Sequence, residues 1–401
     1  MRIRTRRVLA AIVALSAAGC WVQPGGSSGR THHASWERTF TPETIGDVVE
    51  LWRSPMPTTS RGTGPVAAPV SRDGVVYAAD QAAGLAAFDL ATGARLWGVE
   101  QYLWVDDAVI GDPLIFDESA LLVPVNPVGS DPATSYYSAS AGDHLGVYGG
   151  GAPLAVAPYA WSSVQVPHPD GRPPTRAVLG YTEDREPPSV ALGPDLSVPA
   201  YALSGEVALW SEGTDAVAFA DCPLANQGAT CAPRWRVPLG DRPVGPAVVG
   251  TDAVVYADVG GTVHVLDIAT GAVRYRAEAG SAVSVPPAVA GDTILVATDA
   301  GHLVALPAAG CGAAACAPLW VGSVGRPPST APVAGAEVAY VARMGGGISA
   351  FDLTGCGTAR CSPRRVLRTG ATVTGGPVLE PGRLVAGLAD GNVVAYGLDD
   401  G

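Results

Sequence analysis

The sequence predicts an all-β protein, a single β-propeller whose ring is closed by its N-terminal strand. Three observations lead to this prediction: a short phrase that recurs along the chain, a proline that opens each copy of it, and a last copy that lacks one strand. The 401 residues include 51 glycines and 35 prolines, which suits many short strands joined by turns. No long stretch has the 3.6-residue periodicity of an amphipathic helix.

The recurring phrase reads as a short strand, a turn of small residues, a second short strand, a turn with Asp, Thr and Gly, and a further strand. Clear copies occupy residues 74–97, 253–275 and 294–320. One such unit cannot bury both faces of its own sheet, whereas copies packed side by side can. The period is that of a propeller blade with four strands, about 40–45 residues.

A proline before a short apolar run marks the start of each copy. Proline is tolerated at the first residue of a strand, where no hydrogen bond of the ladder is lost. The markers are Pro69, Pro113, Pro153, Pro188, Pro246, Pro287, Pro332 and Pro377. They predict eight four-stranded blades. Residues 100–187 follow the pattern poorly, and one blade with a long insertion there would give seven.

The last copy stops after its third strand, residues 391–397. Residues 48–53 carry the Leu-Trp ending of the other fourth strands but have no copy in front of them. We therefore expect residues 48–53 to pair with the C-terminal strands. Such pairing closes the ring and removes exposed sheet edges, which otherwise invite aggregation. The predicted propeller spans residues 44–401.

The N-terminus predicts an exported protein. Residues 1–19 have the arginine-rich start, the short apolar core and the small residues of a signal peptide. The Ala-Gly-Cys that ends at Cys20 resembles a bacterial lipobox, which predicts a lipid on Cys20 and a membrane-anchored lipoprotein on the extracytoplasmic side. Simple cleavage with an unmodified cysteine is the alternative. Residues 20–43 are expected to be a flexible tether between lipid and propeller.

Seven cysteines are present, and the six besides Cys20 fall into three local pairs in the turns between third and fourth strands. The pairs are Cys222 with Cys231, Cys311 with Cys316 and Cys356 with Cys361. Equivalent positions in three blades predict three structural disulfides. Zinc would need four ligands that converge in space, whereas these pairs belong to separate blades. No metal site is therefore predicted.

The phrase at residues 87–97, Ala-Phe-Asp-Leu-Ala-Thr-Gly-Ala-Arg-Leu-Trp, resembles the PQQ-like repeat of quinoprotein-type propellers. The resemblance covers roughly residues 44–401. In that family a glycine and a tryptophan of adjacent blades dock against each other. The resemblance implies this docking role for Trp97, Trp235 and Trp320, with Tyr275 as a substitute.

The function implied by the resemblance is less specific, because this repeat occurs in redox enzymes, assembly scaffolds and receptor ectodomains. The propeller lipoproteins of the outer-membrane β-barrel assembly machinery resemble the chain in both repeat and lipobox. They imply the leading hypothesis, a non-catalytic envelope scaffold that binds a protein partner. A ligand sensor, for example for a carbohydrate, is the third hypothesis: aromatic residues between 102 and 161 could stack on such a ligand, and packing within the loops is the alternative role for them.

Quinoprotein dehydrogenases imply the second hypothesis, a sugar or alcohol dehydrogenase that depends on pyrroloquinoline quinone or calcium. That family clamps its quinone with an adjacent Cys-Cys disulfide, and the sequence contains no Cys-Cys. Its calcium ligands, Glu, Asn and Asp, have no recognisable counterpart here. The sequence therefore leans against an enzyme, and no cofactor is predicted.

No catalytic residue is predicted either. Only His144 and His168, in the irregular region, are kept as candidates for a site on loops. Asp89, Asp267 and Asp352 recur at one position of the phrase. Their recurrence predicts a turn in which the Asp side chain accepts hydrogen bonds from nearby backbone amides.

The charge balance argues against a nucleic-acid partner. The formal net charge is −12, and all 25 basic residues are arginines. Binding to nucleic acid requires a basic field along the phosphates, which this composition does not supply.

Overall fold

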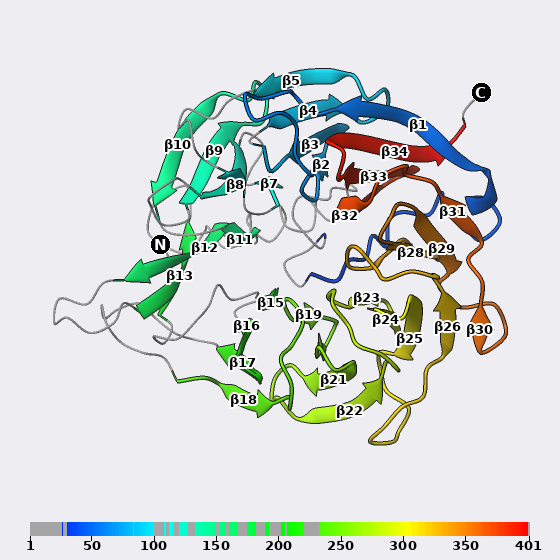
Figure 1. Cartoon of the computed structure of the whole chain (residues 1–401). Helices are drawn as coiled ribbons and strands as arrows, with labels where there is room; N and C mark the ends of the chain where they lie inside the picture. The colour runs from blue at the N-terminus through cyan, green and yellow to red at the C-terminus, as the bar shows by residue number, and fades with distance from the viewer. Residues whose placement is uncertain are drawn as a thin grey trace, which may run out of the picture.

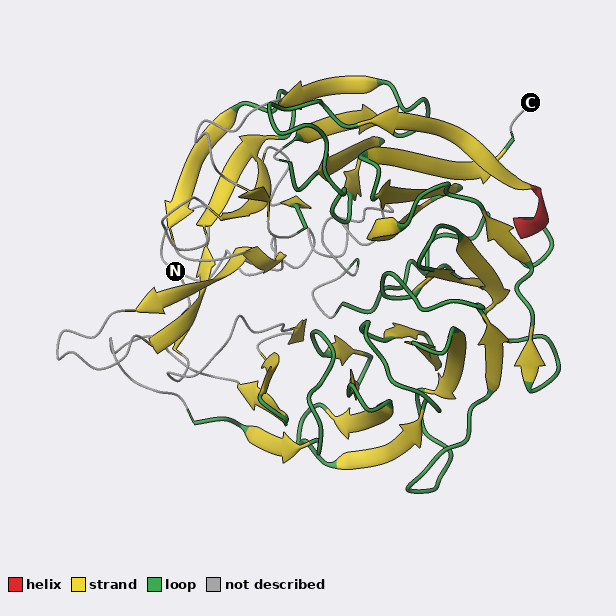
Figure 2. Ribbon diagram, in the orientation of Figure 1, coloured by secondary structure: helices red, strands yellow, loops and turns green. Residues whose placement is uncertain are grey.

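A computed structural model shows a ring of antiparallel β-sheets (Figure 1), with strands and loops distinguished in Figure 2. It describes residues 26, 30–82, 84–99, 108–109, 112–115, 120–126, 133–149, 153–156, 160–166, 175–181, 189–191, 202–204, 207–219 and 232–399. Within these ranges the strands form eight sheets, and the one helix is the short 3-10 turn η1 (Ile45–Asp47). The predicted all-β propeller is confirmed.

The first four sheets follow one another along the chain, each running from an innermost to an outermost strand. The first contains β2 (Val70–Arg72), β3 (Val75–Ala79), β4 (Leu85–Asp89) and β5 (Arg95–Val99). The second contains β6 (Ala108–Val109), β7 (Leu114–Ile115), β8 (Ala120–Asn126), β9 (Ala133–Ser138) and β10 (His144–Gly149). The third contains β11 (Pro153–Val156), β12 (Ala160–Val166), β13 (Thr175–Tyr181) and β14 (Ser189–Ala191). The fourth contains β15 (Ala202–Ser204), β16 (Val207–Glu212), β17 (Asp215–Phe219) and β18 (Trp235–Pro238).

The remaining four sheets complete the ring. The fifth contains β19 (Val248–Val249), β20 (Ala253–Ala257), β21 (Thr262–Asp267) and β22 (Val273–Glu278). The sixth contains β23 (Ala288–Ala290), β24 (Thr293–Thr298), β25 (His302–Pro307) and β26 (Trp320–Ser323), and β30 (Arg360–Cys361) is added at its edge. The seventh contains β27 (Val333–Ala334), β28 (Val338–Ala342), β29 (Ile348–Asp352) and β31 (Arg365–Leu367). The eighth contains β32 (Val373–Glu380), β33 (Arg383–Leu388), β34 (Asn392–Leu398) and β1 (Val48–Pro55).

The ring closes as the sequence predicts. β1 pairs antiparallel with β34 from Val48 opposite Leu398 to Pro55 opposite Asn392, with a bulge between Glu50 and Trp52. Figure 1 shows the blue β1 beside the red β34. The eighth sheet therefore joins the two ends of the propeller.

One of the eight prolines expected to precede the first strand of a blade precedes a different strand instead. Pro188 precedes β14, which pairs with β13 and is the outermost strand of the third sheet rather than the first strand of the fourth. The innermost strand of the fourth sheet is β15. Proline is tolerated at a sheet edge as well as at the start of an innermost strand, so a proline before a short apolar run fits both positions.

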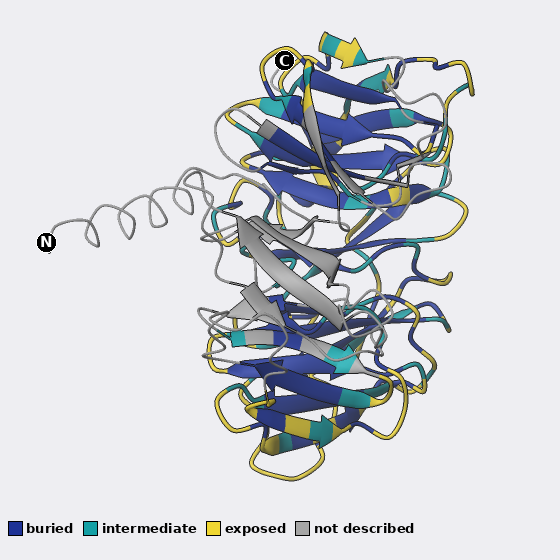
Figure 3. Ribbon diagram, turned by 90° about the vertical axis from the view of Figure 1, so that its left-hand side faces the viewer, coloured by how far each residue is buried: buried dark blue, intermediate teal, exposed yellow. Residues whose placement is uncertain are grey.

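Burial follows the position of a strand within its sheet (Figure 3). All five residues of the middle strand β20 are buried, and so are all five of β28. The outermost strand β22 instead alternates between exposed and buried positions. Middle strands are covered on both faces by the neighbouring sheets, which explains why β20 and β28 consist of Val, Ala and Tyr throughout.

Adjacent sheets dock through a glycine that lies flat on an aromatic ring. A Cβ atom placed on Gly355 would lie 2.6 Å from Cδ1 of Trp320, so no other residue fits there. The indole Nε1 of Trp320 also donates a hydrogen bond to the carbonyl of Leu353 (3.2 Å). The same contact recurs for Gly142 on Trp97 and for Gly271 on Trp235. These are the positions that the PQQ-like resemblance indicated.

Two further docking contacts join the three described above, one through a tyrosine and one at a position that was not predicted. Tyr275 takes the place of a tryptophan, and its hydroxyl donates to the carbonyl of Pro307 (2.6 Å) while its ring lies under Gly310. Trp52 of the closing strand was not predicted to dock. It nevertheless contacts Gly93 and donates to the carbonyl of Leu90 (2.9 Å).

Two of the three predicted disulfides are present, Cys311–Cys316 and Cys356–Cys361. Cys222 and Cys231 lie outside the described residues. Each of the two closed loops joins the third strand of its sheet to the next strand outward, and it also reaches the preceding sheet. In the second loop β30 pairs in parallel with β26, and in the first Ala315 forms a parallel bridge with Arg276 of β22.

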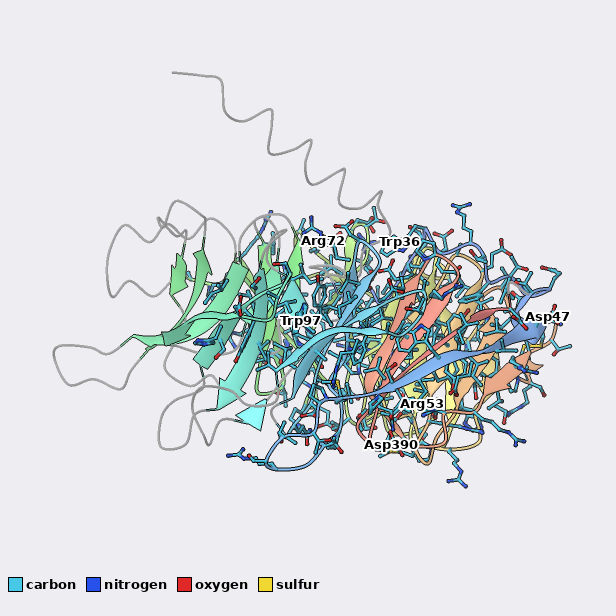
Figure 4. The ribbon with its side chains drawn as sticks, turned by 90° about the horizontal axis from the view of Figure 1, so that it is seen from above. Trp36, Asp47, Arg53, Arg72, Trp97 and Asp390 are labelled. Carbon is cyan, nitrogen blue, oxygen red and sulfur yellow. A yellow bond between two sulfur atoms is a disulfide. The ribbon has the colours of Figure 1, made fainter. Side chains whose placement is uncertain are left out.

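The ring has two faces, seen from the side in Figure 4. Innermost strands end at one of them, which we call the Arg72 face after the last residue of β2. Innermost strands begin at the other, where second and third strands are joined, and we call it the Asp390 face after the turn between β33 and β34. The two disulfide loops follow third strands and so lie on the Arg72 face.

Candidate functional site in the axial channel

The N-terminal segment enters the channel at the centre of the ring. The backbone N of Val289 donates to the carbonyl of Thr31 (2.9 Å), and the N of Ala334 donates to the carbonyl of His32 (2.9 Å). The N of Ala34 donates back to the carbonyl of Ala334 (2.8 Å). Val289 and Ala334 belong to the innermost strands β23 and β27. Residues 31–34 therefore line the inner wall as an added strand segment, which Figure 1 shows in blue running outward from the middle of the ring.

Residues 35–43 continue as packed structure. Phe40 is fully buried, and its ring makes an edge-on contact with Tyr340 at a centroid distance of 6.5 Å. Trp36 packs against the same apolar core. The expected flexible tether of residues 20–43 is therefore corrected for residues 30–43, which belong to the folded propeller. The reason is that their apolar side chains find a place between the innermost strands.

Glu37 fixes this segment from inside the protein. Its side chain is completely buried, and Oε1 accepts hydrogen bonds from the backbone N of Thr39 (2.8 Å), Phe40 (3.2 Å) and Gly382 (3.4 Å). Oε2 has no hydrogen-bond partner. Burial raises the pKa of the Glu37 carboxyl above its usual range, and these hydrogen bonds offset only part of that effect.

A cavity of about 280 Å³ lies in the channel where the innermost strands begin, at the Asp390 face. Residues 30 and 32 of the N-terminal segment contribute to its wall. The other lining residues come from the starts of innermost strands in several sheets: Ala68, Asp112, Pro246, Val285, Pro286, Ser329, Thr330, Ala331, Val333, Thr374, Gly376 and Pro377. This cavity is the candidate functional site.

The charged groups of the cavity are Arg30 and Asp112. Oδ1 of Asp112 accepts a hydrogen bond from the backbone N of Ala68 (2.7 Å). Burial raises the pKa of Asp112, while this hydrogen bond and the positive charge of Arg30 act against the rise. Burial and the same arginine lower the pKa of His32 to about 3, so His32 is neutral at neutral pH.

Three hydroxyl groups complete the polar lining. Thr374 donates to the carbonyl of Val66 (2.9 Å), and Thr330 donates to the carbonyl of Ala331 (3.3 Å). The Oγ of Ser329 is buried and has no hydrogen-bond partner. The cavity thus offers a cation, a carboxyl group, a neutral imidazole and an unpaired hydroxyl.

Two residues at the cavity hold an unusual backbone conformation. Arg30 has φ of 53° and His32 has φ of 54°, both in the left-handed region. Non-glycine residues enter this region at a cost and stay there where surrounding contacts hold them. The hydrogen bonds of Thr31, His32 and Ala34 to the inner strands supply such contacts.

The described lining does not fit calcium and pyrroloquinoline quinone. Calcium takes six to eight oxygen ligands, largely carboxylates, whereas the described lining contains one carboxyl group, on Asp112. The quinone is a tricarboxylate, and Arg30 is the one cation among those lining residues. Across the described ranges, no three His, Cys, Asp or Glu side chains come together as a metal site.

The predicted loop-site candidates lie elsewhere. His144 begins β10, the outermost strand of the second sheet, and its ring contacts Tyr137 at a centroid distance of 5.2 Å. Tyr137 is itself buried in the core, which suits packing rather than stacking on a ligand. His168 lies outside the described residues. Neither histidine belongs to the described lining of the cavity.

The recurring aspartates form turns, as their repetition predicts. Asp89 Oδ1 accepts from both the backbone N (2.8 Å) and the hydroxyl (2.7 Å) of Thr92, and these bonds lower its pKa. Asp267 accepts in the same way from Thr270, and its contact with Arg274 is the main reason that its pKa falls to about 2. Asp352 accepts from Thr354 (2.9 and 2.6 Å).

A buried histidine and aspartate form a pair that the sequence did not indicate. Nε2 of His264 lies 3.0 Å from Oδ2 of Asp258, and both side chains are nearly inaccessible. Asp258 also accepts from the backbone N of Thr262 (2.9 Å) in the turn between β20 and β21. Asp80 holds the equivalent turn of the first sheet by accepting from the N of Gly84 (2.8 Å). The shared turn role shows that Asp258 is structural.

The comparison with protein families gives one match. The family model described as outer membrane protein assembly factor BamB, PQQ_2, matches residues 225–355. The matched residues include the docking residues Trp235, Tyr275 and Trp320. Residues 225–355, less than half of the chain, are therefore similar to the PQQ-like repeats of that family. No curated protein sequence matches the chain significantly.

Solved structures share this fold at low sequence identity. Quinohemoprotein alcohol dehydrogenase from Comamonas testosteroni is 12% identical, with a TM-score of 0.68 over 99% of this chain and 82% of its own. BamB from Moraxella catarrhalis is 16% identical, with a TM-score of 0.54 over 88% of this chain and 98% of its own. The computationally designed protein Ika8 is 13% identical, with a TM-score of 0.61 over 86% of this chain and 99% of its own.

The chain thus resembles the BamB family model over residues 225–355, and it shares its propeller fold with both BamB and quinohemoprotein alcohol dehydrogenase. Within the described ranges no helix is long and apolar enough to cross a membrane.

Proposed function

We propose that this propeller is a non-catalytic scaffold of the cell envelope, held at the membrane by a lipid on Cys20 and binding a protein partner. The observation that carries the proposal is the path of the N-terminal segment. Residues 30–34 line the axial channel, where a propeller enzyme of this repeat type would need room for a cofactor. The match of residues 225–355 to the BamB family model supports the same role.

Affinity capture tests the proposal. The mature lipoprotein and a Cys20→Ser variant are each expressed in a bacterial host, and proteins retained from solubilised membranes are compared. We expect the wild type to fractionate with membranes and to retain a defined envelope protein in stoichiometric amount. The Cys20→Ser variant should be released as a soluble protein of unchanged fold. Equal membrane retention of the two forms would refute the lipid anchor.

A quinone-dependent dehydrogenase is the second candidate, because the TM-score to the quinohemoprotein structure, 0.68, exceeds that to BamB, 0.54. Titration with pyrroloquinoline quinone and calcium decides between the two. The scaffold proposal expects no stoichiometric absorbance change and no dye reduction with a panel of alcohols and sugars. A saturable spectral change together with dye reduction would replace the scaffold by an enzyme.

A further inference from the structure

Few residues separate the predicted lipid site from the packed part of the N-terminal segment. Residues 30–43 are packed, so the ten residues 20–29, which we call the tether, lie between Cys20 and that part. Ten extended residues span at most about 35 Å. This upper limit follows from covalent geometry and holds for any conformation of the ten residues. A lipid on Cys20 would hold the propeller close to the bilayer.

The tether also begins at the axis of the ring rather than at its rim. Arg30 lines the cavity together with residues that precede the innermost strands of several sheets. Neighbouring strands are about 4.8 Å apart, so four strands place the rim about 14 Å beyond the innermost strand. The distance from axis to innermost strand and the outermost side chains add to this value. An edge-on propeller would therefore use up most of the maximum reach of about 35 Å.

We propose that the tether holds the propeller with one flat face toward the membrane and its rim away from the bilayer. This inference rests on the lipid anchor of the proposed function. The face that points toward the membrane would then bind a protein that lies in the bilayer or directly above it. The opposite face and the outermost strands are open to soluble partners.

The absence of lysine from the chain provides a direct test. Three single substitutions each introduce one amine for dye labelling while keeping a positive charge. Arg326→Lys lies on the Asp390 face, where residue 326 is exposed beside the turn of Gly301. Arg364→Lys lies on the Arg72 face, where the arginine side chain is 49% exposed. Arg236→Lys lies on the outermost strand β18, where it is 41% exposed.

The experiment uses residues 20–401 coupled through the Cys20 thiol to a maleimide lipid in vesicles, in a Cys222→Ser/Cys231→Ser background. Energy transfer from each dye to an acceptor lipid is measured, with the lysine-free chain as the labelling background. We expect the two faces to differ by at least about twofold in transfer, since a strand of eight residues separates them by about 27 Å. The rim dye should give an intermediate value.

Two results would overturn the inference. Highest transfer from the rim dye would mean that the ring stands edge-on. Equal transfer from all three dyes would mean that the tether imposes no orientation or that residues 30–43 leave the channel. Because the lipid is attached chemically, the result does not depend on whether cells acylate Cys20. Loss of lipidation in the capture experiment would therefore refute the proposed function without affecting this measurement.

Discussion

The glycine-aromatic contacts join neighbouring sheets through single residues. Gly355 has φ of +89°, and its position leaves no space for a Cβ atom beside Trp320. The resemblance to the PQQ-like repeat implied this docking role for Trp97, Trp235 and Trp320, with Tyr275 as a substitute. Trp52 escaped prediction because it precedes the first complete copy, so no turn in front of it marks its position.

Replacement of Gly355 by alanine should destabilise the protein strongly. We expect the free energy of unfolding to fall by about 2–4 kcal/mol, from the forced contact with Trp320 and the left-handed backbone together. Gly357→Ala is a matched control, because Gly357 has φ of +76° but nothing within 4 Å of an added Cβ. It should cost only about 1 kcal/mol. Urea unfolding of both variants measures the difference, and equal losses would show that the ring contact contributes nothing.

The buried Glu37 should make stability depend on pH. Its folded-state pKa is raised, so the folded protein holds this proton to a higher pH than the unfolded chain does. This contribution is therefore present below the unfolded pKa and is lost as pH rises through the folded pKa. Glu37→Gln removes the buried charge and keeps an oxygen acceptor. The unfolding free energy of Glu37→Gln minus that of the wild type should increase with pH from about 4 upward, and a flat difference would contradict the prediction.

The cavity residues could not be assembled from the sequence. Arg30 precedes the first repeat, Asp112 stands directly before a marker proline, and Ser329 lies in a connection between sheets. None of these positions repeats, so no pattern sets them apart. Their proximity arises only because innermost strands of many sheets begin around one axis, which is a property of the closed ring.

At the scale of elements, the disulfide loops do more than close a turn. The backbone N of Val321 donates to the carbonyl of Ala359 (2.9 Å), which adds the Cys356–Cys361 loop to the edge of β26. The N of Cys316 donates to the carbonyl of Arg276 (3.2 Å), which adds the Cys311–Cys316 loop to β22 in the same way. The sequence predicted these two pairings from equivalent positions, but it gave no sign that each loop covers the edge of the preceding sheet.

Opening one of these loops should weaken the junction between two sheets. The double substitution Cys356→Ser/Cys361→Ser should lower the free energy of unfolding by about 2 kcal/mol, the value that chain entropy gives for a loop this short. Proteolysis should then begin within residues 353–362. Cys311→Ser/Cys316→Ser is the comparison, with cleavage expected near residues 308–317. Unchanged stability in both variants would show that backbone pairing alone holds the loops.

The assignment of residues 30–43 to a tether failed for a physical reason. Polar residues such as His32 and His33 resemble a linker, and no repeat covers this stretch. Trp36 and Phe40 are the signal that was available, since large apolar side chains are unusual in a solvated linker. The burial of Phe40 and the packing of Trp36 against the core account for the difference.

At the scale of the whole molecule, ring closure was predictable because the last copy lacked one strand and an unpaired strand stood near the N-terminus. The number of sheets was harder to predict, because residues 100–187 carry few of the repeated turns. The third sheet illustrates the difficulty: its outermost strand β14 begins just after a marker proline that was assigned to the next sheet.

Stepwise truncation should separate the roles of the N-terminal segments. A chain that begins at residue 30 should keep the full melting temperature, since it retains all the described strands together with Glu37 and Phe40. A chain that begins at residue 44 loses Glu37 and Phe40 and should melt at least about 5 °C lower. A chain that begins at residue 57 lacks β1, exposes the edge of β34 and should aggregate on size-exclusion chromatography. A monomeric product from the last truncation would contradict the role of β1.

The pairing of β1 with β34 has a consequence for folding during synthesis. A ribosome delivers the chain from its amino terminus, so β1 is among the first segments to emerge and β34 among the last. For most of the period of synthesis β1 is the one strand of the eighth sheet that exists, since β32, β33 and β34 are made after the strands of the other seven sheets. The ring can therefore close only after β34 has left the ribosome. A chain that is truncated before β34 cannot form the pairing with β1.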